Sequence, residues 1–176
     1  MTETDALAAD FRHVMRRLAS AVAIITSCRD GAPSGMTATA VTSVSVDPPS
    51  LIIAINRSAS IHDVIADGRR FCVNLLSRSH AELVEPFSGK SKGAERFAVG
   101  AWEEDALGLP FLTDALASVL CEVDGALSYG SHTLFIGKVE AIRMGRAADP
   151  LVWQDGRGAA TFPLPPTRIE AASGRR

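Results

Sequence analysis

The chain has 176 residues, of which 47% are hydrophobic and 22% charged, and this balance predicts one globular domain rather than a disordered chain. Its 18 Lys and Arg against 20 Asp and Glu give a formal charge of −2, without the basic run that indicates nucleic-acid binding. No apolar stretch reaches about 18 residues and no signal pattern opens the chain, so we expect a cytoplasmic protein without a membrane span.

Cysteine and histidine spacing gives no sign of a metal site. Cys28, Cys72 and Cys121 are odd in number and far apart, which predicts buried free thiols rather than a disulfide framework. The histidines form no H-x-x-x-H or H-E-x-x-H pattern; they are His13, His62, His80 and His132. We therefore expect no metal ion.

The first half of the chain alternates strands with short helices. Residues 10–19 carry apolar side chains at helical spacing and predict an amphipathic helix with Asp10 as N-cap. A strand is expected at 21–27, a turn at 29–35, and a hydroxyl-rich strand up to Asp47, where two prolines end it. Residues 50–56 predict a third strand, 57–68 a short helix and 70–76 a fourth strand.

The second half is dominated by two long apolar stretches. Residues 79–89 predict a second short helix and 90–114 a polar loop. Residues 115–130 and 131–145 then predict paired antiparallel strands, and 151–156 one further strand. Six or seven strands with few helices disfavour a doubly wound sheet, which needs crossover helices, and favour a β-barrel. The domain is expected to span residues 10–162, followed by a Pro-rich tail, 163–176.

Standard nucleotide and hydrolase motifs are missing. The run VEPFSGKS approaches the phosphate-loop pattern G-x-x-x-x-G-K-[ST], but Val84 stands where the first glycine belongs and no strand precedes it. No G-x-G-x-x-G opens a helix, and no G-x-S-x-G offers a nucleophile. Chemistry that depends on these motifs is not indicated.

The segment GMTATAVTSVSVDPPSLIIAIN, residues 35–56, carries an unusual number of hydroxyls for an apolar run. Threonine suits a pleated strand, which would explain part of the pattern. Alternatively, the hydroxyls and nearby amides hold a polar ligand against the sheet. The residues alone leave both interpretations open.

Six segments, in order, resemble the short-chain flavin reductases with an FMN-binding split barrel: FRHVMRRLASAVAIITS, GMTATAVTSVSVDPPSLIIAIN, RFCVNLL, ERF, ALASVLCEV and GSHTLFIGKV. The resemblance implies a mainly β fold, a six-stranded antiparallel split β-barrel with a few short peripheral helices. It implies an NAD(P)H-dependent reductase that supplies reduced FMN or FAD to a partner monooxygenase. It also implies a homodimer with flavin near the subunit interface, in keeping with the apolar strand LFIGKVEAI.

The same resemblance assigns flavin-binding residues. The ring edge would lie along Thr37, Ala38, Thr39 and Ala40, with Ser43 and Val44 close by. The ribityl phosphate would lie near Asn56, Arg57, Ser58 and Ser60, and a loop with Lys90, Lys92 and Arg96 near that phosphate or an adenine. The alternative for Ser58 or Ser60 is that either merely caps the helix that follows.

The resemblance places nicotinamide binding at Gly130-Ser131-His132, where many family members have Gly-Asp-His. His132 would be the catalytic residue, whereas an isolated histidine at a strand start is more often structural. NADH is the expected reductant, with NADPH as the alternative. Two other functions stay open: a flavin-binding electron carrier or sensor without nicotinamide turnover, and a reductase of another acceptor such as a corrinoid.

Overall fold

A computed structural model describes residues 3–146 and 149–164; most of the expected tail lies outside these residues. The main sheet is antiparallel, with strand order β3-β2-β6-β9-β10-β5-β4. Its strands are β2 (Ala23–Arg29), β3 (Ala32–Ala38), β4 (Val41–Val46), β5 (Pro49–Asn56), β6 (Arg70–Leu75), β9 (Ala117–Tyr129) and β10 (His132–Met144). One small sheet contains β1 (Ser20–Ala21), β11 (Val152–Gln154) and β12 (Arg157–Ala159). A second contains β7 (Trp102–Glu104) and β8 (Pro110–Leu112).

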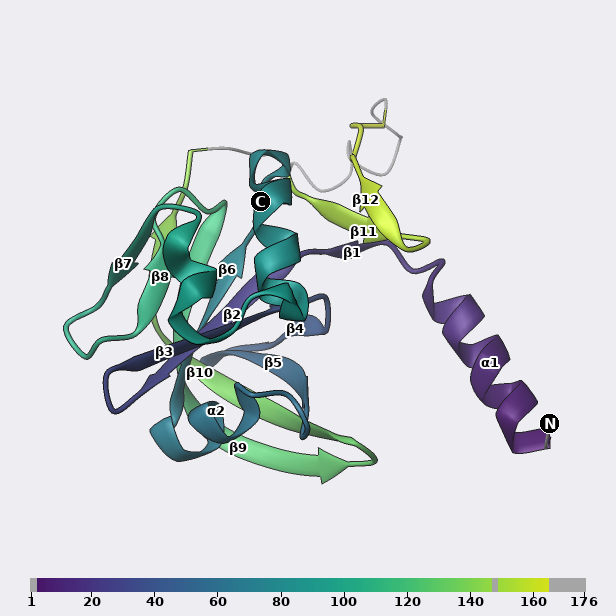
Figure 1. Ribbon diagram of the computed structural model, residues 1–176, viewed down its shortest axis with the longest axis horizontal. Coiled ribbons are helices and arrows are strands. Elements are labelled where there is room, and N and C mark those ends of the chain that lie inside the picture. The colour runs from purple at the N-terminus through teal and green to yellow at the C-terminus, as the bar shows by residue number, and fades with distance from the viewer. Residues whose placement is uncertain (1–2, 147–148, 165–176) are drawn as a thin grey trace.

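The sheet rolls into a barrel at Thr39 and Ala40. Strands β3 and β4 are the two outer strands of the sheet, yet only these two residues separate them in the chain. The two edges must therefore approach each other, and they do so at one side of the barrel (Figure 1). The predicted antiparallel split barrel is confirmed. Because the hydroxyl-rich run forms two strands instead of one, the main sheet has seven strands where six were expected.

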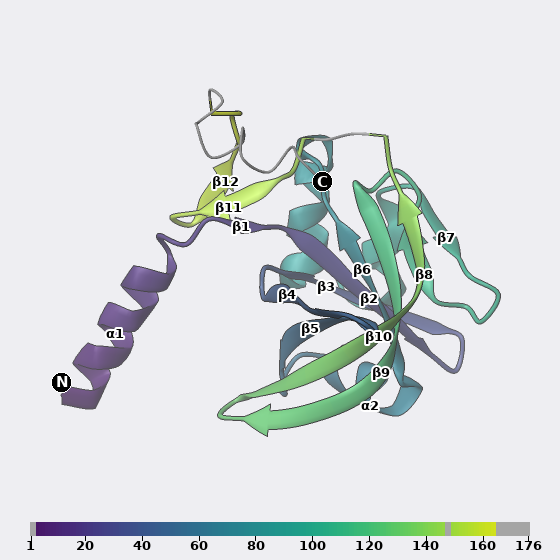
Figure 2. The same ribbon diagram turned by 180° about the vertical axis from the view of Figure 1, so that it is seen from behind.

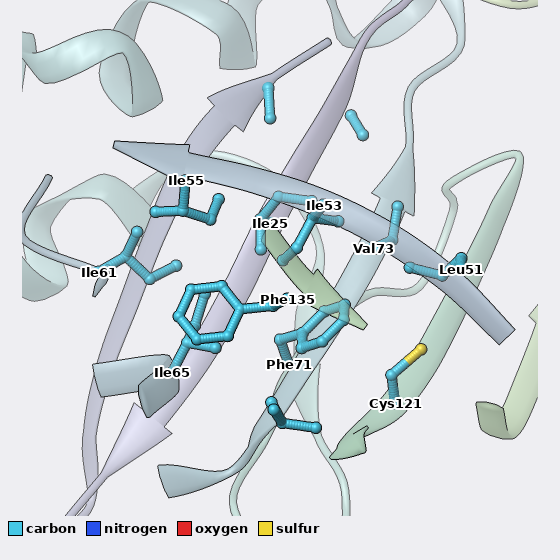
Figure 3. Close-up of a cluster of buried hydrophobic side chains, with 13 residues drawn as sticks. Ile25, Leu51, Ile53, Ile55, Ile61, Ile65, Phe71, Val73, Cys121 and Phe135 are labelled. Carbon is cyan, nitrogen blue, oxygen red and sulfur yellow. The ribbon is translucent and has the colours of Figure 1, made fainter. Parts of the chain in front are cut away.

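The barrel core consists of branched and aromatic side chains from both halves of the chain (Figure 3). Ile25, Ile53 and Phe135 are fully or almost fully buried strand residues. Ile61, which precedes the helix α2 (His62–Gly68), and Ile65 within it point into the same core. Each such side chain stabilises the fold by about 1.5–3 kcal/mol when buried. The packing of α2 also fixes the segment 57–61 that leads into it.

A second cluster lies under three short helical segments. These are the 3₁₀ helix η1 (Arg78–Leu83), the π-helical turn η2 (Pro86–Lys90) and the 3₁₀ helix η3 (Gly93–Ala98). The ring of Phe87 lies 5.2 Å from that of Phe97 and 5.3 Å from that of Trp102, centroid to centroid. The expected polar loop 90–114 is thus more ordered than predicted. Phe97 and Trp102 pack on the cluster that contains Ile24 of β2, η3 contacts β3, and the three-residue strands β7 and β8 pair.

The N-terminal helix α1 (Glu3–Met15) projects away from the barrel (Figures 1 and 2). It begins earlier than the sequence predicted, since the Ala- and Leu-containing stretch before Asp10 also favours a helix. Asp10 lies inside the helix, so its prediction as N-cap was wrong. The apolar residues of this segment are exposed, namely Leu7, Phe11, Val14, Met15 and Leu18.

Strands β9 and β10 form a long hairpin whose tip extends beyond β6 and ends level with β5 (Figure 2). Strand β6 pairs only with Ala117–Glu122 of β9, and β5 pairs with His132–Lys138 of β10. The tip turns at Gly130, whose φ of +54° lies in the left-handed region that glycine adopts readily. The predicted antiparallel pair is confirmed, and its tip lies beside the end of β5.

Candidate functional site

A groove of about 410 Å³ lies between β3, the segment before α2, and η2. It combines polar groups with small and apolar side chains. Its lining residues are Met36, Thr37, Ala59, Ser60, Ile61, Phe87, Ser88, Gly89 and Arg96. Two residues predicted to bind flavin, Thr37 and Ser60, are therefore brought together although 23 positions separate them in the chain.

Hydroxyl groups join β3 to η2 at this groove. The Thr37 hydroxyl donates to the Val84 carbonyl at 3.2 Å, and the Ser88 hydroxyl donates to the same carbonyl at 2.6 Å. The two hydroxyl oxygens are 3.5 Å apart. Strand β3 is an edge strand, so no further strand pairs with its outer side. These side-chain hydrogen bonds connect η2 to β3 there and so hold the η2 wall of the groove in place.

Arg96 brings a positive charge to the groove. Its guanidinium donates to the Gly35 carbonyl, and its Nε donates to the Ser91 carbonyl at 2.8 Å. In the described part of the chain its partners are carbonyls and not carboxylates, so its charge is not neutralised by an ion pair. A half-buried guanidinium with spare N–H donors is a suitable partner for a phosphate.

The loop before α2 has a different role from a helix cap. The Asn56 Oδ1 atom accepts hydrogen bonds from both the backbone N–H and the hydroxyl of Ser58, each at 2.9 Å. The N-cap of α2 is Ile61, and no side chain makes a capping hydrogen bond. The interpretation of Ser58 or Ser60 as a cap was therefore wrong. Among the described residues, the Ser60 hydroxyl has no hydrogen-bond partner and is free to bind a ligand.

The other residues assigned to the ring edge do not line this groove. The Ala38 side chain is buried in the barrel core, because side chains alternate across a strand. Thr39 and Ala40 line a neighbouring hollow of about 690 Å³, together with α1 and Trp153. Ser43 and Val44 are exposed on β4 and line neither space. The end of β3 at Ala38 and the passage of the chain into β4 separate what the sequence presents as one continuous run.

His132 lies next to the predicted phosphate segment, outside the groove itself. It pairs across the sheet with Asn56, and its Nδ1 is 2.9 Å from the Ser131 hydroxyl oxygen. The Arg57 N–H donates to the Ser131 carbonyl at 2.9 Å and holds the hairpin tip against this segment. The imidazole is exposed, so a ligand can reach it.

Sequence reasoning missed Phe87 and Ser88 and gave Arg96 no specific role. Arg96 was grouped with Lys90 and Lys92 as a basic loop, but Lys90 forms an ion pair with Glu85. The only sequence signal for a role of Arg96 was this cluster of basic residues. Its one groove-lining member is identified by a hydrogen bond to Gly35, which lies 61 residues earlier in the chain.

The cysteines are unsuited to chemistry. Burial raises the pKa of the Cys121 thiol to about 12 and that of Cys72 further still, while burial and nearby Glu104 raise the pKa of Cys28. All three are free thiols. Within residues 3–146 and 149–164, no three His, Cys, Asp or Glu side chains gather as a metal site would require. No helix there has the length and apolar character to span a membrane.

Residues 15–161 match the family model described as "Flavin reductase like domain". The chain is 37% identical over 156 residues to the reductase component of FADH(2)-dependent resorcinol hydroxylase from Rhizobium sp. (strain MTP-10005), covering 88% of this chain and 87% of that protein. It is 42% identical over 149 residues to FMN reductase (NADH) RutF from Variovorax paradoxus (strain S110), covering 85% and 83%.

A solved structure agrees with this match. The styrene monooxygenase flavin reductase SMOB from Pseudomonas putida S12 superposes with a TM-score of 0.78 at 32% identity, covering 89% of this chain and 99% of that one. Sequence and fold therefore point to the same relatives over nearly all of the described residues. The chain belongs to the flavin reductase like domain family.

Proposed function

We propose that this protein is an NADH-dependent flavin reductase that supplies reduced FMN or FAD to a separate monooxygenase. Three similar proteins support the proposal by their names: a hydroxylase reductase component, an FMN reductase (NADH) and a styrene monooxygenase flavin reductase. The observation that carries it is the groove in which Thr37, Ser60, Ser88 and Arg96 converge.

The residues of the groove fit the parts of a flavin nucleotide. Arg96 is the cationic partner for the phosphate, and the Ser60 hydroxyl, which has no hydrogen-bond partner among the described residues, donates a neutral hydrogen bond beside it. Met36 is half-buried and provides apolar surface for a flat ring, while the buried Phe87 supports the groove from below. Small residues at Ala59 and Gly89 leave the backbone accessible. When bound, the flavin supplies the ring that accepts a hydride.

Hydride transfer requires correct positioning more than it requires a reactive side chain. This explains why a chain with inert thiols and without a hydrolase motif can act as an oxidoreductase. His132, fixed beside Asn56 at an exposed hairpin tip, is the residue we assign to holding the nicotinamide. Its neutral ring suffices, since the transfer takes no proton from it.

We propose a homodimer for the complete enzyme. The apolar face of α1 supports this, because Leu7, Phe11 and Val14 are each more than 60% exposed. The hollow beside that helix is also lined by Thr39 and Ala40, which follow the strand that carries Thr37, so a second copy packed on α1 would cover a space next to the flavin groove. Phe135 of the apolar strand LFIGKVEAI packs in its own barrel and is not available to a second copy. Sedimentation of a fully active enzyme at the mass of one chain would refute the dimer.

The three free thiols support a reducing compartment, and we propose the cytoplasm as the site of action.

The activity is tested by following NADH and NADPH oxidation with added FMN and FAD. Many turnovers per enzyme would exclude a flavin carrier or sensor. Arg96→Gln should raise the dissociation constant of FMN about 10- to 150-fold, the range for a lost hydrogen bond to a charged group. Arg96→Lys should lose less, because it retains the charge.

Lys92→Gln is the matched control, since Lys92 is exposed in the same loop and does not line the groove. It should bind FMN like the wild type. Equal FMN affinity in the Arg96→Gln and Lys92→Gln variants would remove the phosphate from this groove.

A further inference from the structure

His80 lies between two elements outside the groove and uses both ring nitrogens. It is the third residue of η1 and only 7% exposed. Its Nδ1 accepts a hydrogen bond from the Ser77 N–H at 3.2 Å, and the Ser77 hydroxyl lies 3.0 Å from the same nitrogen. Its Nε2 is 3.2 Å from a carboxylate oxygen of Asp114, which precedes β9.

These contacts select one form of the imidazole. Since Nδ1 faces a backbone N–H, that nitrogen must carry a lone pair. The proton therefore resides on Nε2 and is donated to Asp114, an assignment made from the hydrogen-bond partners. The ring closes a capping box at the start of η1 on one side and attaches η1 to the β8–β9 connection on the other.

The end of η1 leads directly to the groove wall. Leu83, its last residue, is buried with Phe87 and Leu112 in one cluster. The next carbonyl, that of Val84, accepts the hydroxyls of both Thr37 and Ser88. A shift of η1 would therefore move the Val84 carbonyl and the two hydroxyls that depend on it. Nothing in the proposed chemistry uses His80 directly.

We propose that His80 is a positioning residue for flavin binding: by linking Ser77 to Asp114 it holds η1, and through Val84 it sets the η2 wall of the groove. The inference rests on the proposed flavin reductase function. His80 does not line the groove, so we expect it to control flavin affinity and not the rate of hydride transfer.

Three substitutions separate the two links. His80→Ala removes both. His80→Asn keeps an acceptor where Nδ1 lies but does not reach Asp114, whereas His80→Gln keeps a donor near Nε2 but loses the acceptor for Ser77. Asp105→Asn is the control for general destabilisation, since Asp105 belongs to an ion-pair network with Arg70 and does not line the groove.

FMN binding, measured by flavin fluorescence, and steady-state kinetics are compared with the melting temperature of each variant. We expect His80→Ala to raise the FMN dissociation constant and KM about 5- to 50-fold, the scale of a buried N–H that loses its acceptor. The kcat at saturating FMN should stay within about twofold. Asn and Gln should each restore part of the affinity, and Asp105→Asn should lower the melting temperature without changing KM.

A merely structural His80 gives a different result. If the Asn and Gln variants fold with lowered melting temperatures but wild-type KM for FMN, as in Asp105→Asn, the inference is overturned even if His80→Ala does not fold. If the wild-type protein neither binds FMN or FAD nor oxidises NADH, the proposed function itself fails, and this inference fails with it.

Discussion

Replacing Gly35 by alanine should damage both the stability of the protein and its flavin groove. A Cβ atom at Gly35 would lie 2.6 Å from Cε1 and 2.9 Å from Cδ1 of Phe87, whereas ordinary contacts begin at 3.4 Å. Phe87 is only 2% exposed and packs against Phe97 and Trp102. The ring therefore cannot retreat without disturbing its neighbours.

The expected cost follows from overpacking. Forcing an extra methyl group into a filled core costs about 1–3 kcal/mol. For a domain of this size, that lowers the melting temperature by roughly 2–4 °C for each kcal/mol. Because Phe87 lines the groove and Gly35 also accepts a hydrogen bond from Arg96, FMN affinity should fall in the same variant.

Gly158→Ala provides the matched control. Gly158 also lies in a strand and does not have a positive φ, but its nearest neighbour for a new Cβ is Leu151 Cδ1 at 3.8 Å, an ordinary contact. Thermal unfolding and FMN titration of both variants, and of Gly35→Ala with Phe87→Leu, form the assay. The smaller leucine at position 87 should relieve the clash with the added methyl group at position 35 and recover part of the lost stability, because substitutions at two residues in contact are not additive. Equal stability of the two alanine variants would refute this account.

Three further predictions concern other parts of the chain. Gly137→Ala should destabilise by about 1–3 kcal/mol in urea unfolding, since its Cβ would overlap Phe71 and meet Cys121 Cβ at 2.9 Å in the barrel core. Because His132 is exposed, His132→Ala should change the free energy of unfolding by no more than about 0.5 kcal/mol. The same substitution should lower kcat/KM for NADH about 10- to 100-fold in stopped-flow flavin reduction. Burial opposes ionisation of Asp105, but hydrogen bonds from Arg70 and the backbone of Leu109 and Leu107 outweigh it and lower its pKa. Its stabilisation is therefore complete above the unfolded pKa of about 3.9 and is lost as pH falls through the lower folded value; Asp105→Asn should cost about 1.5–3 kcal/mol at pH 7, and this difference should shrink below pH 4.

Much of the fold could be predicted from local patterns. The strands at β2, β5, β6, β9 and β10 are long, apolar and bounded by turn residues, and they formed as expected. The division between β3 and β4 was missed because the residues around Thr39 have strand propensity on both sides. The strand is divided only because the chain passes from one edge of the sheet to the other at Thr39 and Ala40. That change of edge is a tertiary feature, and the residue types around it do not predict it.

The site divides in the same way. Thr37 and Ser60 were predicted by resemblance and do line the groove, while Ser43 and Val44 lie outside it. Arg96 could not be distinguished from the nearby lysines, because its role depends on a contact with Gly35 formed only in the folded chain. Residue type identified candidates; the end of β3 at Ala38 and the packing of η2 and η3 selected among them.

The open edge of β3 explains why the groove lies where it does. A closed barrel would satisfy this strand with a full ladder of backbone hydrogen bonds, which is rigid and leaves no room for a ligand. Here β3 and β4 are both edge strands, and β3 is covered instead by single hydrogen bonds from Thr37 to Val84 and from Arg96 to Gly35. A flavin that is bound, reduced and released needs a wall of this kind, because a few separate contacts can adjust while the barrel stays intact. If so, amide exchange should be faster in residues 78–98 than in β6 and β9 of the free enzyme, and saturating FMN should slow exchange in that segment selectively.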